Sequence, residues 1–330
     1  MKILITGGGG FIGTNAIEAF AALGHEICDF SAEEPLNSDY QRYWQKGDIL
    51  DRAATAKKFR EFQPQWVLHL AARADCDENT TVETGYPVNT TGTQNVLDAI
   101  KATPSIERAV ITSTQFVCGP GPLPRGDEDY FPATIYGQSK VITEQLTRAA
   151  SLPCCWTIIR PTNVWGPWHM RYRREFWRVL QRKMYVHPGR EVVIRSYGYV
   201  KNVVDQIRRI FEAPAEKVAG QTIYVGDRPI NLLEWANGFS RLLAGREVIV
   251  VPRPLMRALA LLGDVPTKLT GKAFLINSSR YRSMITHYPT PMDPTFTLLG
   301  ENPFSMQQGI EETVAWLGRY DGPGTSGGGA

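Results

Sequence analysis

The chain has 330 residues, of which 43% are hydrophobic, enough to bury a core in one large or two modest domains. Its formal charge of +3 is close to balance, which gives no argument for a nucleic-acid partner. No apolar run approaches the length needed to cross a membrane, and we expect no membrane partner. The five cysteines lack metal-ligand spacing, which favours reduced thiols, a cytoplasmic location and no bound metal.

Short apolar segments alternate with helical patterns through the first half of the chain. This alternation predicts an α/β fold, a Rossmann doubly wound parallel sheet with crossover helices. The strands that we expect are residues 2–6, 26–30, 66–71, 109–113, 155–160 and 221–225. The helices that we expect are residues 12–23, 53–62, 88–102 and 135–150.

The composition changes after residue 160, where Arg, Trp, Tyr and Pro become frequent. Clefts that bind polar ligands have such aromatic walls with a few charged groups. We therefore predict a Rossmann domain over 1–162 with part of 190–230. A smaller C-terminal α/β substrate-binding lobe would take 163–189 and 231–320. The glycine-rich end, 321–330, predicts a disordered tail.

Four consecutive glycines follow the first predicted strand, and a helical pattern follows them. Gly7 permits a tight turn, Gly10 lets the backbone approach a pyrophosphate, and Gly13 lets helix and strand pack closely. The N–H groups at the helix start, near Phe11 and Ile12, then face the phosphates. Four glycines alone could form a flexible loop, but their place between a strand and a helix predicts a dinucleotide site.

An acidic residue that binds the adenosine ribose is expected about twenty positions further on. That position is Ser31, which cannot accept two ribose hydrogen bonds as a carboxylate would. Asp29, Glu33 or Glu34 could substitute for it. No Arg or Lys stands beside Ser31 to receive a 2′-phosphate, so NAD is favoured over NADP.

Tyr136 and Lys140 are four residues apart, so a helix places them on one face. A lysine ammonium close to a phenol favours the phenolate and lowers its pKa from about 10 toward neutral pH. An ordinary exposed pair has the same spacing, but here a predicted strand ends in Thr112-Ser113-Thr114 and supplies hydroxyls. A tyrosine base, a polarising hydroxyl and a lysine are what hydride transfer at a carbinol carbon needs.

At this point the chain resembles the extended short-chain dehydrogenase/reductases, especially their nucleotide-sugar epimerase/dehydratase branch. The motifs that carry the resemblance span nearly the whole chain. They are Thr6-Gly7-Gly8-Gly9-Gly10-Phe11-Ile12-Gly13, Asp48-Ile49, His69-Leu70-Ala71-Ala72, Asn89 with Gly92-Thr93, Tyr136-Gly137-Gln138-Ser139-Lys140, and Arg160-Pro161-Thr162-Asn163-Val164-Trp165-Gly166-Pro167.

The resemblance implies a role for each matching position. Thr114, Tyr136 and Lys140 would be catalytic. Asn163 and Arg195 would bind the substrate diphosphate, with Arg280 or Arg282 as candidates for a further arginine. A homodimer through helices 88–102 and 135–150 is also implied. The implied cofactor contacts are Gly7, Gly10, Phe11, Ile12, Gly13, Ser31, Asp48, Ile49, Leu70, Ala71, Ala72, Asn89, Tyr136 and Lys140.

The two residues after Thr114 discriminate among reactions of this branch. Its dehydratases carry an acidic pair there, but this chain has Gln115 and Phe116, which cannot exchange protons. The leading hypothesis is therefore an NAD-dependent epimerase of a nucleotide sugar, which we expect to be UDP-linked, acting through a transient keto-sugar. His169 and His187 could assist proton transfer, although structural roles are favoured.

Two other hypotheses stay open. One is an NAD(P)-dependent dehydrogenase or reductase of a sugar or sterol-like alcohol, for which the Leu/Ala-rich stretch 255–262 gives some support. The other is a non-catalytic NAD(P)-sensing protein, since Rossmann domains also have such roles. The intact Tyr136 and Lys140 pair argues against a sensor, which has no need of a phenolate.

Overall fold

The computed structural model describes residues 1–270 and 277–321. The chain divides into two compact units, each built from several segments. The first unit contains Met1–Trp168, Tyr197–Arg228 and Thr290–Phe304. The second contains His169–Ser196, Pro229–Pro289 and the chain from Ser305 onward. All but the first residue of the predicted tail, 321–330, lies outside the described residues.

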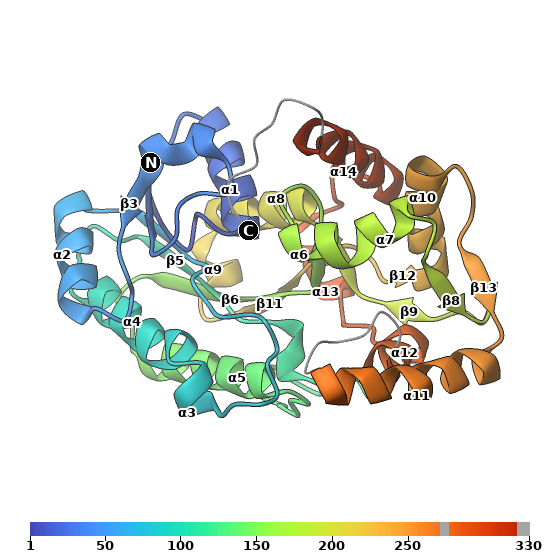
Figure 1. Ribbon diagram of the computed structural model, residues 1–330. Helices are drawn as coiled ribbons and strands as arrows, with labels where there is room; N and C mark the ends of the chain where they lie inside the picture. Colours follow the sequence, from blue (N-terminus) through green and yellow to red (C-terminus); the bar gives the residue numbers. More distant parts are fainter. Residues whose placement is uncertain (271–276, 322–330) are drawn as a thin grey trace. The chain divides into compact units, whose positions relative to one another are not determined.

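The first unit is built on a seven-stranded sheet of parallel neighbours in the order β11-β6-β5-β4-β1-β2-β3 (Figure 1). This confirms the predicted Rossmann fold. The order reverses at β1, which has β2 on one side and β4 on the other, and α/β folds bind ligands at the carboxyl edge of such a point. The strands are β1 (Lys2–Thr6), β2 (Glu26–Ser31), β3 (Trp44–Lys46), β4 (Trp66–His69), β5 (Arg108–Thr112), β6 (Cys155–Pro161) and β11 (Thr222–Val225).

Helices cover both faces of this sheet, as the parallel topology requires. The predicted helix 88–102 is in the structure a π-helical turn, η2 (Val88–Gly92), that continues into α4. A separate two-stranded pair, β7 (Asn163–Trp165) with β10 (Tyr197–Tyr199), follows the end of β6. The other helical elements of this unit are α1 (Phe11–Ala22), η1 (Ser38–Tyr43), α2 (Arg52–Phe62), α3 (Val82–Gly85), α4 (Thr93–Lys101), η3 (Gln115–Val117), α5 (Ile135–Ala149), α8 (Val200–Glu212), α9 (Ala215–Val218) and α13 (Asp293–Leu299).

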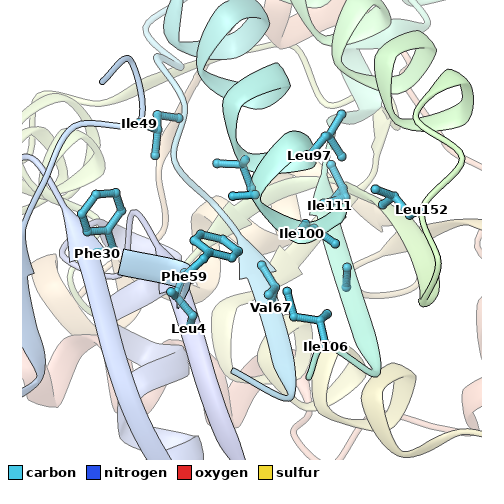
Figure 2. Close-up of a cluster of buried hydrophobic side chains, with 13 residues drawn as sticks. Leu4, Phe30, Ile49, Phe59, Val67, Leu97, Ile100, Ile106, Ile111 and Leu152 are labelled. Carbon is cyan, nitrogen blue, oxygen red and sulfur yellow. The ribbon is translucent and has the colours of Figure 1, made fainter. Parts of the chain in front are cut away.

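Alternate side chains of the strands enter two different apolar layers. On one face Leu4 and Val67 pack with Phe59 from α2 and Ile100 from α4, all of them fully buried (Figure 2). Each such side chain contributes roughly 1.5–3 kcal/mol through removal from water. Because both faces of the sheet are buried, the carboxyl ends of its strands are a rigid frame for a site.

The opposite face of the sheet packs against α1 and α8. Phe211 from α8 stacks on Trp66 from β4, with ring centroids 4.8 Å apart. Phe20 from α1 meets Phe211 edge to face at 6.1 Å. These contacts fix α1, and hence the glycine loop before it, against the sheet.

The second unit has an aromatic core and only short strands. Phe176 and Trp235 stack with centroids 4.7 Å apart, and Trp177 lies beside Phe239 and Trp316. Strands pair here as β8 with β13 and as β9 with β12. The elements are α6 (Met170–Tyr172), η4 (Arg173–Trp177), α7 (Arg178–Gln181), β8 (Val186–Pro188), β9 (Ile194–Arg195), β12 (Ile230–Asn231), α10 (Leu232–Ala244), β13 (Ile249–Val251), α11 (Arg253–Thr270), α12 (Ser278–Ile285) and α14 (Met306–Tyr320).

Candidate active site

The glycine loop joins β1 to α1 at the carboxyl edge of the sheet. Gly7 has φ of +74°, and a Cβ there would lie 2.7 Å from the backbone of Ala71. A Cβ on Gly13 would lie 2.5 Å from the carbonyl oxygen of Gly7, so helix and loop touch backbone to backbone. Gly10 is the N-cap of α1 and has no side chain to accept from the first N–H groups of the helix. These donors are therefore available to a phosphate.

Asp29 lies on β2, two residues before Ser31 and on the same side of the strand. Its side chain is fully buried against the loop, where a Cβ on Gly8 would lie 2.6 Å from the carboxyl carbon. The Ser31 hydroxyl donates to Oδ1. Oδ2 is buried and has no hydrogen-bond partner among the described residues. Burial raises the pKa of Asp29 to about 6. The structure thus offers an acid at the predicted ribose position, displaced from Ser31 by two residues.

The other predicted cofactor residues surround the loop in different ways. Asp48 is exposed, and its Oδ1 accepts from the amide of Leu50 at 2.9 Å. Ile49 is buried and fills the space in front of Gly92. The backbone of Leu70, Ala71 and Ala72 continues from β4, directly beside Gly7.

Asn89 is fully buried and connects two elements of the first unit. Its Oδ1 accepts from the amide of Arg73 at 2.8 Å. Its Nδ2 donates to the Arg73 carbonyl at 3.0 Å and to Ser139 Oγ at 2.9 Å. The amide therefore ties the segment after β4 to α5, the helix that bears the predicted catalytic pair.

Thr114 and Tyr136 meet at the end of β5. Thr114 is the N-cap of η3 and accepts from the amide of Phe116 at 3.3 Å. Tyr136 stands in the first turn of α5, whose N-cap is Thr134, and the Thr114 side chain is near enough to lower the pKa of its phenol. Both side chains are buried. The structure thus brings the predicted base and the polarising hydroxyl together.

The predicted effect on the Tyr136 phenol is corrected by the structure. Burial raises the pKa of Tyr136, although the hydrogen bond from Thr114 acts in the opposite direction. Lys140 lies one turn further along α5 and is itself buried, with Nζ donating to the carbonyl of Thr112 at 2.7 Å. Burial lowers the pKa of Lys140 to about 7, against the neighbouring Glu144. For both side chains, the loss of hydration on burial has a larger effect on the pKa than the polar neighbours, which are Thr114 for Tyr136 and Glu144 for Lys140. Sequence spacing alone does not reveal this loss of hydration.

A buried network behind this pair was missed by sequence reasoning. Glu144, one turn after Lys140, accepts from Ser113 Oγ at 2.6 Å and from Tyr130 Oη at 3.0 Å. Arg160 from β6 donates to the same carboxylate through Nε at 2.8 Å and Nη2 at 2.9 Å. Both charged side chains are almost fully buried. The network joins β5, β6 and α5, and so holds the strand end with Thr114 against the helix with Tyr136.

His69 at the end of β4 also belongs to the buried frame. Its Nδ1 lies 2.7 Å from Thr6 Oγ1 and its Nε2 lies 3.1 Å from Thr93 Oγ1. Thr93 donates its own proton to the carbonyl of Asn89, so we assign the ring proton of His69 to Nε2. Burial lowers the pKa of His69 to about 3, which keeps the ring neutral.

The three predicted diphosphate ligands are divided between the units. Asn163 opens β7 in the first unit, and its Nδ2 is buried without a partner among the described residues. Arg195 on β9 donates from Nη1 to the carbonyls of Ser283 at 2.7 Å and Thr286 at 3.3 Å. Arg280, also in the second unit, donates to Glu175 at 3.3 Å. Arg195 thus contacts α12, and Arg280 belongs to that helix.

The two histidines have structural contacts within the second unit. His169 is the N-cap of α6, and its Nδ1 accepts from the amide of Tyr172 at 3.0 Å. Nδ1 of His187 lies 3.3 Å from Tyr185 Oη. Burial lowers the pKa of each histidine to about 4, so both rings are neutral near pH 7.

Comparison with known proteins identifies the family. The family model described as "NAD dependent epimerase/dehydratase family" matches residues 3–226. The chain belongs to this family. It is therefore an enzyme of the epimerase and oxidoreductase type, and NAD is its cofactor.

The relatives of this family member carry different activities. It is 28% identical over 255 residues to a 3β-hydroxysteroid dehydrogenase/Δ5→4-isomerase of Mycobacterium tuberculosis, covering 71% of this chain and 67% of that one. It is 26% identical to an N-acetyl-α-D-glucosaminyl-diphospho-undecaprenol 4-epimerase of Escherichia coli, over 96% and 95% of the two chains. The UDP-glucuronic acid 4-epimerase of Bacillus cereus has the same fold, with a TM-score of 0.73, 19% identity and coverage of 97% and 99%.

The residues present fit NAD at three points. The first turn of α1 presents N–H donors, and Gly7 and Gly13 leave no space for side chains between loop and helix. Asp29 Oδ2 is a buried acceptor without a donor among the described residues. A ribose hydroxyl is a suitable donor for that oxygen. Among residues 1–270 and 277–321, no group of three His, Cys, Asp or Glu side chains could hold a metal ion. No helix in these described ranges is long and apolar enough to span a membrane.

Proposed function

We propose that this protein is an NAD-dependent epimerase of a nucleotide sugar, with UDP as the expected nucleotide. The observation that carries the proposal is the buried Thr114 and Tyr136 pair at the end of β5, followed by Gln115 and Phe116. The pair can move the proton of a carbinol hydroxyl, and the two following side chains cannot exchange protons for an elimination. Epimerisation needs the first ability and not the second.

The proposed reaction assigns one task to each catalytic residue. Bound NAD would supply the hydride acceptor for the sugar carbon and the hydride donor for the opposite face of the keto-sugar. Tyr136 takes the hydroxyl proton in the first half of the cycle and gives it back in the second. Thr114 donates a hydrogen bond to the reacting oxygen. Since burial disfavours release of the Tyr136 proton, a nearby positive charge would favour it, and Lys140 on the same helix face would supply that charge when protonated.

Each unit offers side chains of a kind that binds a diphosphate. In the first unit, Asn163 has a buried N–H donor without a partner among the described residues. In the second, Arg195 and Arg280 carry charge suited to phosphate oxygens. The Escherichia coli relative, similar along nearly its whole length, acts by its name on a diphospho-linked sugar. This supports a sugar diphosphate as the substrate class.

A second candidate function is oxidation of a sterol-like alcohol with release of reduced cofactor. One observation favours it: the similarity to the Mycobacterium tuberculosis hydroxysteroid dehydrogenase. Both candidate functions require the same catalytic roles of Thr114, Tyr136 and Lys140. The two functions differ in whether the hydride returns to the same molecule.

The first experiment is to denature freshly purified protein and identify the released nucleotide by mass spectrometry. We expect NAD in stoichiometric amount, because a closed redox cycle retains its cofactor. UDP-sugars are then supplied, and interconversion of epimers is followed together with the absorbance of reduced nicotinamide. Epimers without net absorbance change support the proposal. If NAD instead exchanges freely, and reduced nicotinamide accumulates when a hydroxysteroid is supplied as substrate, the second candidate function replaces the epimerase proposal.

A further inference from the structure

Helix α11 of the second unit carries a stripe of exposed leucines. Leu255, Leu259 and Leu262 are 54%, 40% and 69% exposed, and their spacing places them on one face of the helix. Leu261 beside them is 56% exposed. The other face holds Met256, which is buried. The helix is thus apolar on two sides, and the described part of the second unit covers only one of them.

The orientation of α11 is fixed by its neighbour α12. The two helices lie side by side (Figure 1) and are joined at the start of α12, where Ser278 donates to the Asp264 carboxylate. The amide donates at 2.9 Å and the hydroxyl at 2.6 Å. Met256 and Ala260 are buried on the inner side. The leucine stripe is therefore held outward by the packing of the second unit itself.

The charge of the second unit identifies what this stripe can meet. The sequence ranges of that unit contain 17 Lys and Arg against 8 Asp and Glu, a formal charge of +9. On α11, Arg253 pairs with Glu191 at 3.3 Å, whereas Arg257 is exposed and one turn from Leu261. A second copy of the same unit would bring like charges together. An anionic surface with an apolar interior satisfies both the arginines and the leucines.

We propose that α11 docks the second unit on a membrane surface that contains anionic lipids. The helix would lie in the plane of the interface, with Leu255, Leu259 and Leu262 entering the acyl boundary. Arg257 would keep its charged end at the lipid phosphates. This departs from the expectation of no membrane partner, which rested on the absence of a spanning segment. Docking does not depend on which reaction the first unit catalyses.

The test uses the full chain with its bound cofactor and two kinds of vesicle. One contains phosphatidylcholine with phosphatidylglycerol, and the other contains phosphatidylcholine alone. We expect sedimentation with the anionic vesicles, weakened by added salt. Replacing Leu255, Leu259 and Leu262 together by Gln should lower the bound fraction about tenfold or more, because the apolar contact is removed. The matched control is Leu242→Gln, which changes an exposed leucine of α10 in the same unit.

Further readouts separate docking from folding, from self-association and from the proposed reaction. Circular dichroism and NAD content should match wild type in both variants. Turnover of a soluble substrate should also be unchanged, so docking and the proposed function can fail independently. Equal vesicle binding by the triple variant and wild type would overturn the proposal. So would the absence of vesicle binding combined with a dimer, seen by ultracentrifugation, that the triple variant loses; the stripe would then join two copies of the chain.

Discussion

The two units of the chain differ most in how they use charge. The first has 19 Lys and Arg against 25 Asp and Glu, a formal charge of −6, whereas the second has +9. In the first unit a charged pair, Glu144 with Arg160, is buried among hydroxyls. In the second unit Phe176 and Trp235 stack in an aromatic core, while Arg171 and Arg174 are exposed.

This difference has a physical explanation in the ligands that we expect each unit to bind. The glycine loop offers N–H groups and a helix dipole to a pyrophosphate, so the first unit needs no excess of cationic side chains. A diphosphate or a lipid phosphate bound by side chains needs arginines instead. Substitutions in the first unit should therefore alter turnover, stability or cofactor choice. Substitutions in the second should alter substrate affinity and its dependence on salt.

The largest effect is expected for Tyr136→Phe. The variant keeps the ring and its packing but removes the hydroxyl that carries the proton. We expect kcat to fall by roughly 10²–10⁴-fold, the usual contribution of a positioned acid or base. NAD content and the unfolding transition, measured on the same preparation, should be those of wild type. Near-normal turnover by this variant would remove Tyr136 from the mechanism.

The next effect is on stability, from Arg160→Met. Removing the guanidinium breaks the hydrogen-bonded ion pair of the buried Glu144 carboxylate and leaves it only Arg148, at 3.7 Å; breaking a buried pair typically costs about 3–5 kcal/mol. Urea unfolding measures the change in the free energy of unfolding. Arg228→Met is the matched control, because Arg228 pairs with Glu301 at the surface and such pairs contribute about 0–1 kcal/mol. If both variants lose a similar amount of unfolding free energy, the buried Arg160–Glu144 pair contributes no more to stability than the surface pair.

A smaller effect is expected in the second unit, from Arg195→Lys. If the planar fork of Arg195 binds the diphosphate, an ammonium ion is a poor replacement. We expect KM to rise about tenfold with little change in kcat, since the interaction is uniform through the reaction. Arg246→Lys, at an exposed position of the same unit, should change neither constant. A lower kcat at an unchanged KM would place Arg195 in a different role.

The Rossmann fold was predictable because the six strands that we expected are short, mostly buried apolar runs. The prediction of 2–6 matches β1, and that of 155–160 is one residue shorter than β6. The three-residue edge strand β3 (Trp44–Lys46) was missed, since it is partly exposed and has no apolar run. The π-helical turn Val88–Gly92 has no sign in the helical periodicity of its segment. Short elements depend on tertiary contacts that a local pattern does not contain.

In the candidate site, too, the sequence predicted what local spacing determines and missed what depends on tertiary contacts. Tyr136 and Lys140 were identifiable because one turn of helix separates them. The pairing of Glu144 with Arg160 was not, because it depends on β6 lying beside α5 in the fold. The direction of the Tyr136 pKa shift was also wrong in the sequence-based expectation, since burial of the phenol becomes visible only when its surroundings are known.

The smallest effect is expected at Asp29, where Asp29→Asn tests the choice of cofactor. An ionised carboxylate at the ribose repels a 2′-phosphate, so its removal should lower the preference for NAD over NADP about tenfold, or about 1.4 kcal/mol. The titration supplies an internal check. With a pKa of about 6 in the folded protein, above its ordinary value, Asp29 keeps a proton that the unfolded chain loses. It therefore lowers stability as pH rises from about 4 to 6, and Asp29→Asn should remove that slope from urea unfolding. An unchanged slope together with unchanged selectivity would exclude Asp29 as the ribose acid and leave Ser31, the position predicted by spacing.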